Sequence, residues 1–159
     1  QLFATDIGQH SIEEINQVVE GNFYGWPIRE GTFVINPFGS FRALYPLPED
    51  DNRFGVTYPT LQLEHDELVA VIGGYVVNEG PLKGKFVFGD IPSGRLFFVD
   101  LREDKAVAYT WGIRHQGKEM SLQELVGHNR VDLKFGQDAA KRLYVMSKTN
   151  GGVYKVVDK

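Results

Sequence analysis

Two strand-forming runs flank one tight turn in residues 85–101, KFVFGDIPSGRLFFVDL. Aromatic and β-branched residues crowd both runs, and such residues favour strands. The intervening IPSG holds Pro and Gly, which commonly mark turns. The stretch therefore predicts an antiparallel hairpin. A phosphate-binding Gly loop is excluded here, because that motif needs a helix after the turn.

Strand patterns continue on both sides of this hairpin. VAVIGGYVV at 69–77 comes before it and AVAYTW at 106–111 comes after it, and both are joined to it by short polar connectors. The Gly pair inside the first run predicts a bulge or a close backbone approach. Together the four runs predict one antiparallel meander that ends near Trp111.

A repeat links this meander to the end of the chain. The Phe-Gly and Arg-Leu-aromatic pattern of residues 88–97 returns at 135–144, an offset of 47 residues from Leu96 to Leu143. Leu2 lies two such periods before Leu96. Periods of this size with four strands per unit predict the blades of a β-propeller. The alternative is that Gly-aromatic strands look alike in any β-sandwich.

Composition limits the class of protein. The chain has 159 residues, a net charge of −4 and no Cys, so a disulfide framework and thiolate metal sites are excluded. No basic run suggests a nucleic-acid interface, and no stretch is long enough for a membrane-spanning helix. The chain begins with Gln1 and enters a strand-like run at once, so we expect a fragment of a longer protein.

The sequence predicts an all-β fold, a partial six-bladed β-propeller of four-stranded antiparallel meanders that holds the last two to three blades. We divide this single domain into a loop and strand (1–21), a long ordered loop insertion (22–62), a blade (63–111) and a closing blade (112–159). Prolines and aromatic residues are dense in the insertion. The aromatic residues expected to anchor it are Phe23, Tyr24, Trp26, Phe33, Phe38, Phe41 and Tyr45.

Oxygen-bearing side chains are concentrated in the first segment. Calcium prefers six to eight oxygen ligands, and a Gly such as Gly8 lets a loop turn its carbonyls inward. Glu13 and Glu14 should face opposite sides of a strand, so at most one of them would bind an ion. The alternative is that both are solvated. The candidate oxygen donors are Asp6, Gln9, Ser11, Glu13, Glu14 and Asn16.

Two further polar clusters are candidates for a site. EHDE at 64–67 could supply a His base, and Arg130 in GHNR at 127–130 could pair with a carboxylate or quinone oxygen. The alternatives are a solvated turn for the first and a salt bridge from Arg130 to Asp132 for the second. SLQELV at 121–126 is the best helix candidate, with a capping box that starts at Ser121.

Residues 6–33, DIGQHSIEEINQVVEGNFYGWPIREGTF, resemble the soluble glucose/sorbosone dehydrogenase family, the quinoprotein sugar dehydrogenases. The likeness lies in the acidic pair, in the following Ile-Asn and in the aromatic-Tyr-Gly-Trp-Pro turn. Residues 70–100 and 130–156 resemble later blades of the same family. The likeness thus extends over nearly the whole chain.

This resemblance implies oxidation of an aldose C1 hydroxyl by hydride transfer to pyrroloquinoline quinone (PQQ), with calcium as a second cofactor. It implies cofactor and calcium binding at Gly8 and Gln9, structural calcium at Glu14 and Tyr24, and quinone contact at Arg130. The catalytic His would lie upstream, with the missing N-terminal blades. The parent would thus be an oxidoreductase, and the fragment alone would be inactive.

The sequence also departs from the family pattern. Gln9 stands where the family has Pro, Ile7 where it has Gln, and Pro92 or Ser93 where it has a PQQ-contacting Lys. The alternative function is a noncatalytic calcium-stabilised propeller that binds carbohydrate or a protein partner, similar to that of the hedgehog-interacting protein. The resemblance implies a periplasmic or extracellular location.

Overall fold

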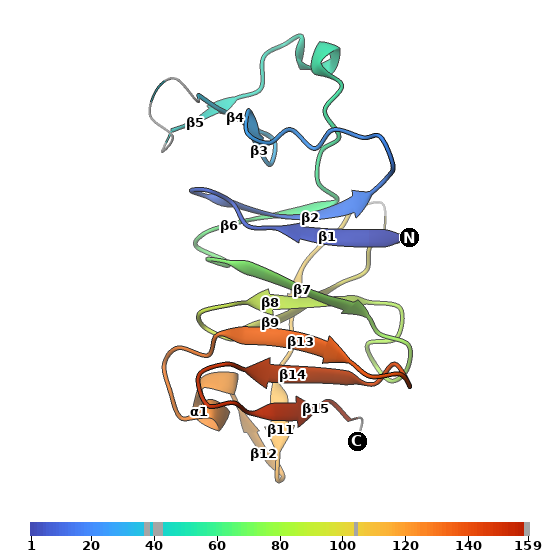
Figure 1. Ribbon diagram of the computed structural model, residues 1–159, viewed down its shortest axis with the longest axis vertical. Coiled ribbons are helices and arrows are strands. Elements are labelled where there is room, and N and C mark those ends of the chain that lie inside the picture. The colour runs from blue at the N-terminus through green and yellow to red at the C-terminus, as the bar shows by residue number, and fades with distance from the viewer. Residues whose placement is uncertain (37–38, 40–42, 104, 158–159) are drawn as a thin grey trace. The chain divides into compact units, whose positions relative to one another are not determined.

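The computed structural model describes residues 1–36, 39, 43–103 and 105–157. Strands in small antiparallel sheets make up most of its regular structure, so the prediction of an all-β fold is confirmed (Figure 1). The chain forms two compact units, Gln1–Val69 and Ala70–Lys159. Within the described residues, no helix has the length and apolar character needed to cross a bilayer.

The first unit contains a three-stranded sheet of order β1-β2-β6. Its strands are β1 (Leu2–Asp6), β2 (Ile12–Val18) and β6 (Leu61–Glu64). The run IEEINQV forms a strand, as its β-branched residues predicted, and its first five residues are all buried. Burial of both faces brings two adjacent carboxylates, Glu13 and Glu14, into the interior.

The insertion after β2 carries a second small sheet of order β3-β4-β5. Its strands are β3 (Arg29–Glu30), β4 (Phe33–Ile35) and β5 (Leu44–Pro46), and a 3₁₀ turn follows at Asp51–Phe54. The buried Arg29 guanidinium joins the sheet to this turn through Asp51, with Nη2 at 2.6 Å from Oδ1. The described part of the insertion thus has a small sheet and a 3₁₀ turn joined by an ion pair. Phe38 and Phe41 lie outside the described residues.

The second unit begins with the predicted four-stranded meander, of order β10-β9-β8-β7. Its strands are β7 (Val71–Val76), β8 (Phe86–Asp90), β9 (Leu96–Val99) and β10 (Tyr109–Thr110). The predicted bulge is present as a register shift between Gly73 and Val76. The IPSG segment is the hairpin turn between β8 and β9.

A Cβ atom at Gly74 would lie 1.9 Å from the backbone oxygen of Val87. Gly74→Ala should therefore lower the free energy of unfolding by about 2 kcal/mol, because the edge strand β7 and its neighbour β8 must shift apart. Gly112→Ala is the matched control, because a Cβ there meets nothing within 4 Å. Urea unfolding checks the difference, and equal effects of the two substitutions would contradict the assigned close approach.

The rest of the second unit is a ribbon of β11 (Ile113–His115) and β12 (Lys118–Met120), the helix α1 (Leu122–Val126), and a sheet of order β13-β14-β15. Its strands are β13 (Leu133–Gln137), β14 (Leu143–Ser147) and β15 (Val153–Lys155). The predicted capping box at Ser121 and Glu124 is present. The core joins α1 to β9, β13 and β14 through Leu96, Leu122, Leu133 and Val145.

Four strands form a meander only in the β10-β9-β8-β7 sheet; the first and last sheets have three described strands each. The repeat itself has a structural counterpart, because β8–β9 and β13–β14 are both antiparallel hairpins. The structure thus shows an all-β chain made of several small antiparallel sheets.

Candidate functional site

The first unit is strongly acidic. Residues 1–69 contain eleven Asp and Glu and only three Arg, with no Lys. Three of these carboxylates come from three different strands and lie close together: Asp6 ends β1, Glu14 lies in β2, and Glu30 ends β3. Asp6 and Glu14 are direct cross-strand partners in the antiparallel register. Like charges in such a pair destabilise a sheet, so this arrangement needs a compensating interaction.

Glu30 holds the hairpin between β1 and β2. Its Oε1 accepts hydrogen bonds from the backbone N–H groups of His10, Ser11 and Ile12, at 3.2, 2.7 and 2.8 Å. The residue is only 2% exposed, yet its Oε2 accepts no hydrogen bond from the described residues. A buried carboxylate oxygen without a partner is costly, which makes this atom a candidate ligand for a cation.

Glu14 makes the second set of contacts. Its Oε1 accepts a short hydrogen bond from the Gly31 N–H, and its Oε2 accepts one from Asn16 Nδ2 at 2.9 Å. The Oδ1 of Asn16 is buried and has no partner. Glu14 and Glu30 thus tie both sides of the Glu30–Gly31 corner to the first sheet.

Asp6 differs from two Asp residues of the second unit that also lie at or just after the end of a strand. Asp90 ends β8 and Asp138 follows β13, and both accept N–H bonds from their own hairpin turns. Burial alone would raise the pKa of Asp138, but hydrogen bonds from Arg142 and Tyr144 lower it to about 2. The side chain of Asp6, in contrast, accepts no hydrogen bond from any described residue, so its oxygens remain available.

The electrostatics of the cluster favour a bound cation. Asp6 is exposed at its outer side, but partial desolvation raises its pKa, and the negative charge of Glu30 raises it further. Burial also raises the pKa of Glu14; hydrogen bonds from Asn16 and Gly31 oppose this, and the charges of Asp6 and Glu30 add to it. A cation among these groups would offset both burial and mutual repulsion.

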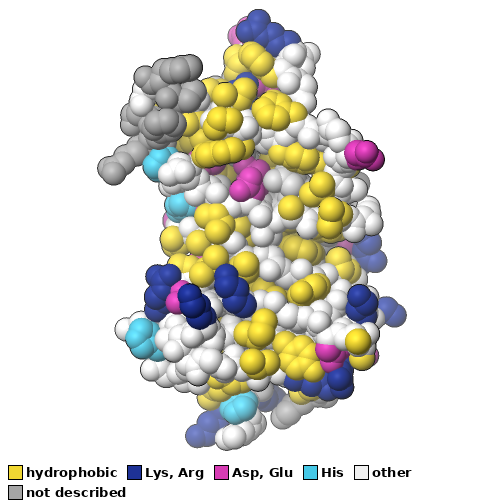
Figure 2. All heavy atoms as spheres, in the orientation of Figure 1, with side chains coloured by type: hydrophobic (Ala, Val, Ile, Leu, Met, Phe, Trp, Pro, Cys, Tyr) yellow, Lys and Arg dark blue, Asp and Glu magenta, His cyan; other side chains and the backbone are white. Residues whose placement is uncertain are grey.

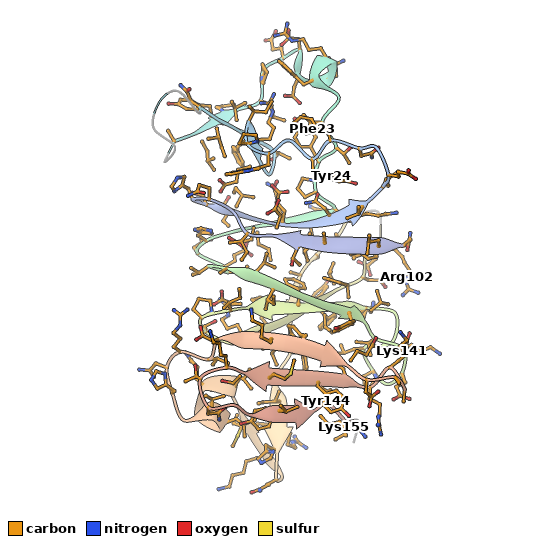
Figure 3. All side chains as sticks on the ribbon, viewed as in Figure 1. Phe23, Tyr24, Arg102, Lys141, Tyr144 and Lys155 are labelled. Carbon is orange, nitrogen blue, oxygen red and sulfur yellow. The ribbon has the colours of Figure 1, made fainter. Side chains whose placement is uncertain are left out.

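A small cavity of about 10 Å³ lies at the cluster. This volume is close to that of one water-sized probe, so it suits a single ion and excludes a larger organic cation. Tyr24 leads from β2 into the insertion at this point (Figure 3). The lining residues are Asp6, Ile7, Gly8, Glu14, Tyr24, Trp26, Arg29 and Glu30.

The donor chemistry of this cavity fits calcium, which takes carboxylate, amide and carbonyl oxygens. The orphaned oxygens of Glu30 and Asn16 provide an independent structural indication. Among the described residues, no group of three or more His, Asp and Glu side chains forms a preorganised metal site.

The predicted site residues are only partly brought together. Gly8, Glu14 and Tyr24 line the cavity, whereas Gln9 is exposed and does not. A Cβ atom at Gly8 would lie 2.0 Å from the Ile12 carbonyl oxygen, so only Gly fits there. Arg130 belongs to the second unit, where its Nε donates to Asp132 at 2.7 Å, as the salt-bridge alternative expected.

Other predictions about side chains had mixed outcomes. The view of Glu13 and Glu14 as solvated residues is wrong, because both are buried. They do form separate contacts: Glu13 Oε1 lies 2.8 Å from His65 Nε2 and accepts the Gly8 N–H at 3.1 Å.

The sequence did not single out Glu30. An acid before a Gly in an irregular insertion gives no periodic signal that could have revealed it.

The relatives of the chain correct the expected family. No family model and no solved structure matches it. The HIPL1 protein of Arabidopsis thaliana is 24% identical over 98% of this chain, and the HIPL2 protein of the same plant is 30% identical over the same share. The chain spans about a quarter of the length of each, 24% in both cases.

The resemblance to PQQ sugar dehydrogenases is therefore not supported as an identification, and the inferred aldose oxidation is wrong with it. The expectation of a PQQ-dependent oxidoreductase is wrong for the same reason, and the matches do not clearly support the alternative of a carbohydrate- or protein-binding propeller. The motif shared with those enzymes consists of turn and scaffold residues, which a β-sheet protein can keep without the chemistry. By comparison, this chain is similar to HIPL proteins.

Proposed function

We propose that this chain is a calcium-binding β-sheet module in which Asp6, Glu14 and Glu30 hold one ion. The observation that carries the proposal is the Oε2 atom of Glu30, which is buried without a partner beside two other carboxylates. Calcium would supply the positive charge that balances these carboxylates. The ion would fasten the insertion, through Glu30 and Gly31, to the hairpin of the first sheet.

The proposed role of the ion is structural. Glu30 already organises three N–H groups of the 8–12 loop, and Glu14 binds Gly31. An ion shared by these two residues and Asp6 would link β1, β2 and β3 at one point. If calcium binds the folded chain and not the unfolded chain, the free energy of unfolding rises with calcium concentration.

We further propose that the sheets are blades of a six-bladed β-propeller, of which this chain supplies two to three. The 47-residue repeat and the paired hairpins support this arrangement. The edge of β1, at the end of its sheet, would take a further strand of the same blade. A crystal structure in which these sheets do not belong to a closed ring of blades would contradict the proposal.

A location outside the cytosol follows as part of the same proposal. Weak calcium sites of the 10⁻⁴–10⁻³ M class, roughly, are typical of extracellular modules, where calcium is abundant. We propose that the site of Asp6, Glu14 and Glu30 belongs to this class. The protein would therefore be extracellular or periplasmic.

Terbium luminescence tests the site directly. Tb³⁺ replaces Ca²⁺ at oxygen sites, and Tyr24 and Trp26 line the cavity and would sensitise its emission. We expect emission that calcium displaces. Glu14→Gln and Glu30→Gln should each weaken binding by at least about tenfold, because the ligand charge count tunes affinity.

Glu49→Gln is the matched control for these variants. Glu49 is an exposed acid of the insertion that does not line the cavity, so its loss should leave emission unchanged. Equal loss of emission in all three variants would indicate nonspecific attraction to an acidic surface. Absence of displaceable emission from the wild type would overturn the calcium proposal.

A further inference from the structure

A second hollow lies in the second unit and is much larger than the acidic cavity. It has a volume of about 470 Å³, within the range of about 300–1,000 Å³ typical of ligand sites. Its floor is apolar and includes Trp111, Leu122, Leu125, Val145 and Val156. These side chains belong to the main core of the unit or pack against it. The core is thus open to solvent at this groove.

Two edge strands border the groove. β15 is the last strand of its sheet, and β11 belongs to a ribbon of only two strands; residues of both line the groove. The Val156 N–H bonds to Leu143 and the Ser147 N–H bonds to Gly152, so the alternation of an antiparallel pair points the backbone groups of Val153 and Lys155 away from β14. An exposed edge of this kind is a template for another strand.

Basic side chains surround the apolar floor. Arg114, His115 and Lys155 line the groove, and none of its described lining residues is Asp or Glu. A smaller hollow of about 170 Å³ adjoins the same end of β15 and includes Lys141 and Arg142, with Glu79 as its one acidic residue. Figure 3 places Lys141, Tyr144 and Lys155 around these strand ends. Figure 2 shows Lys and Arg side chains near the ends of β13 to β15.

Lys155 is the most available of these cations. Arg114 already pairs with Glu119 at 2.5 Å, and Arg142 pairs with Asp138 at 2.6 Å. The ammonium of Lys155 forms no ion pair with any described residue. It stands on the edge strand itself, so an incoming chain could meet its charge and the free backbone groups together.

We propose that this groove binds an extended peptide segment in which apolar and acidic residues alternate, and that the segment pairs with the edge of β15. Alternate side chains of a strand face opposite sides, so apolar ones would enter the groove while acidic ones face the basic rim. The free strand edge favours a peptide over a lipid chain, because only a backbone satisfies its donors and acceptors. Strand addition of this type is a common mode of peptide recognition.

A synthetic peptide of alternating Val and Glu tests the proposal with the full 159-residue chain. Trp111 lines the groove, so its fluorescence reports binding in a Trp26→Phe background that leaves one Trp. We expect saturable binding. It should weaken about tenfold with Lys155→Glu, since rim charges steer association, whereas Lys134→Glu, at an exposed position of β13 outside the groove, should have little effect.

Two altered probes distinguish strand addition from other modes. The same peptide with alternate backbone nitrogens methylated should bind poorly, and a Val-Lys peptide should bind poorly because of its charge. Near-UV circular dichroism confirms that each variant is folded. Equal binding of the methylated peptide, a response to decanoate but not to the Val-Glu peptide, or no binding by the folded wild type would each overturn the proposal.

Discussion

Replacing Glu30 with Ala should lower the free energy of unfolding by about 3 kcal/mol, measured by urea unfolding in the presence of a chelator. The Oε1 atom satisfies three backbone N–H groups of the 8–12 loop. Each buried donor left unpaired costs about 1–3 kcal/mol, although water entering the space would recover part of this cost. The effect should be among the largest from any polar residue in the first unit.

Glu30→Gln separates this structural role from ion binding. The amide keeps an oxygen that can accept the same three hydrogen bonds, and it removes one charge from a cluster of three carboxylates. Without calcium, the variant should therefore be about as stable as the wild type, or more stable. With calcium, only the wild type should gain stability. If Glu30→Ala and Glu30→Gln cost the same without calcium, Oε1 does not act as described.

Arg29→Met should destabilise the chain by about 3 kcal/mol, because removal of one partner leaves a buried charge uncompensated. Arg29 is 5% exposed, and its Nε and Nη2 bond to Asp51 Oδ1 at 3.2 and 2.6 Å. Tyr58 donates a further hydrogen bond to Asp51, and Phe54 lies 5.1 Å from the guanidinium carbon. Loss of the guanidinium should therefore abolish the ion pair and also loosen the 3₁₀ turn that follows β5.

Arg53→Met provides the matched control. Arg53 also lies over Phe54 and pairs with Asp50 at 2.9 Å, but both members of this ion pair are largely exposed. Exposed pairs contribute about 0–1 kcal/mol, so this variant should be nearly neutral. Urea unfolding of both variants gives the comparison. Equal costs at Arg29 and Arg53 would show that burial of the first pair has no energetic consequence.

The strands of the second unit could be predicted from sequence because their signals are local. The aromatic and β-branched runs at 86–90 and 96–99 flank a Pro-Gly turn, and the structure has hairpin strands there. The capping box at Ser121 likewise depends on residues three positions apart. Sequence patterns over so few residues predict the local structure correctly because they depend little on the rest of the chain.

The acidic site could be predicted only in part, because it depends on contacts across the chain. Asp6 and Glu14 meet through strand register, whereas Glu30 reaches the same point from 16 residues beyond Glu14 through the irregular insertion. The small sheet β3-β4-β5 has strands of two or three residues, too short for a periodic signal. Family likeness misled for a related reason: turn residues such as those of 23–27 encode geometry, and geometry alone does not specify a cofactor.

Isothermal titration of the chelator-treated chain with calcium tests the central claim most directly. Our account predicts one calcium per chain, with binding lost in Glu30→Gln and retained in Glu49→Gln, and a calcium-dependent rise in the unfolding temperature of the wild type. A folded wild-type chain that binds no calcium, or that binds it equally well with Gln at position 30, would contradict the account.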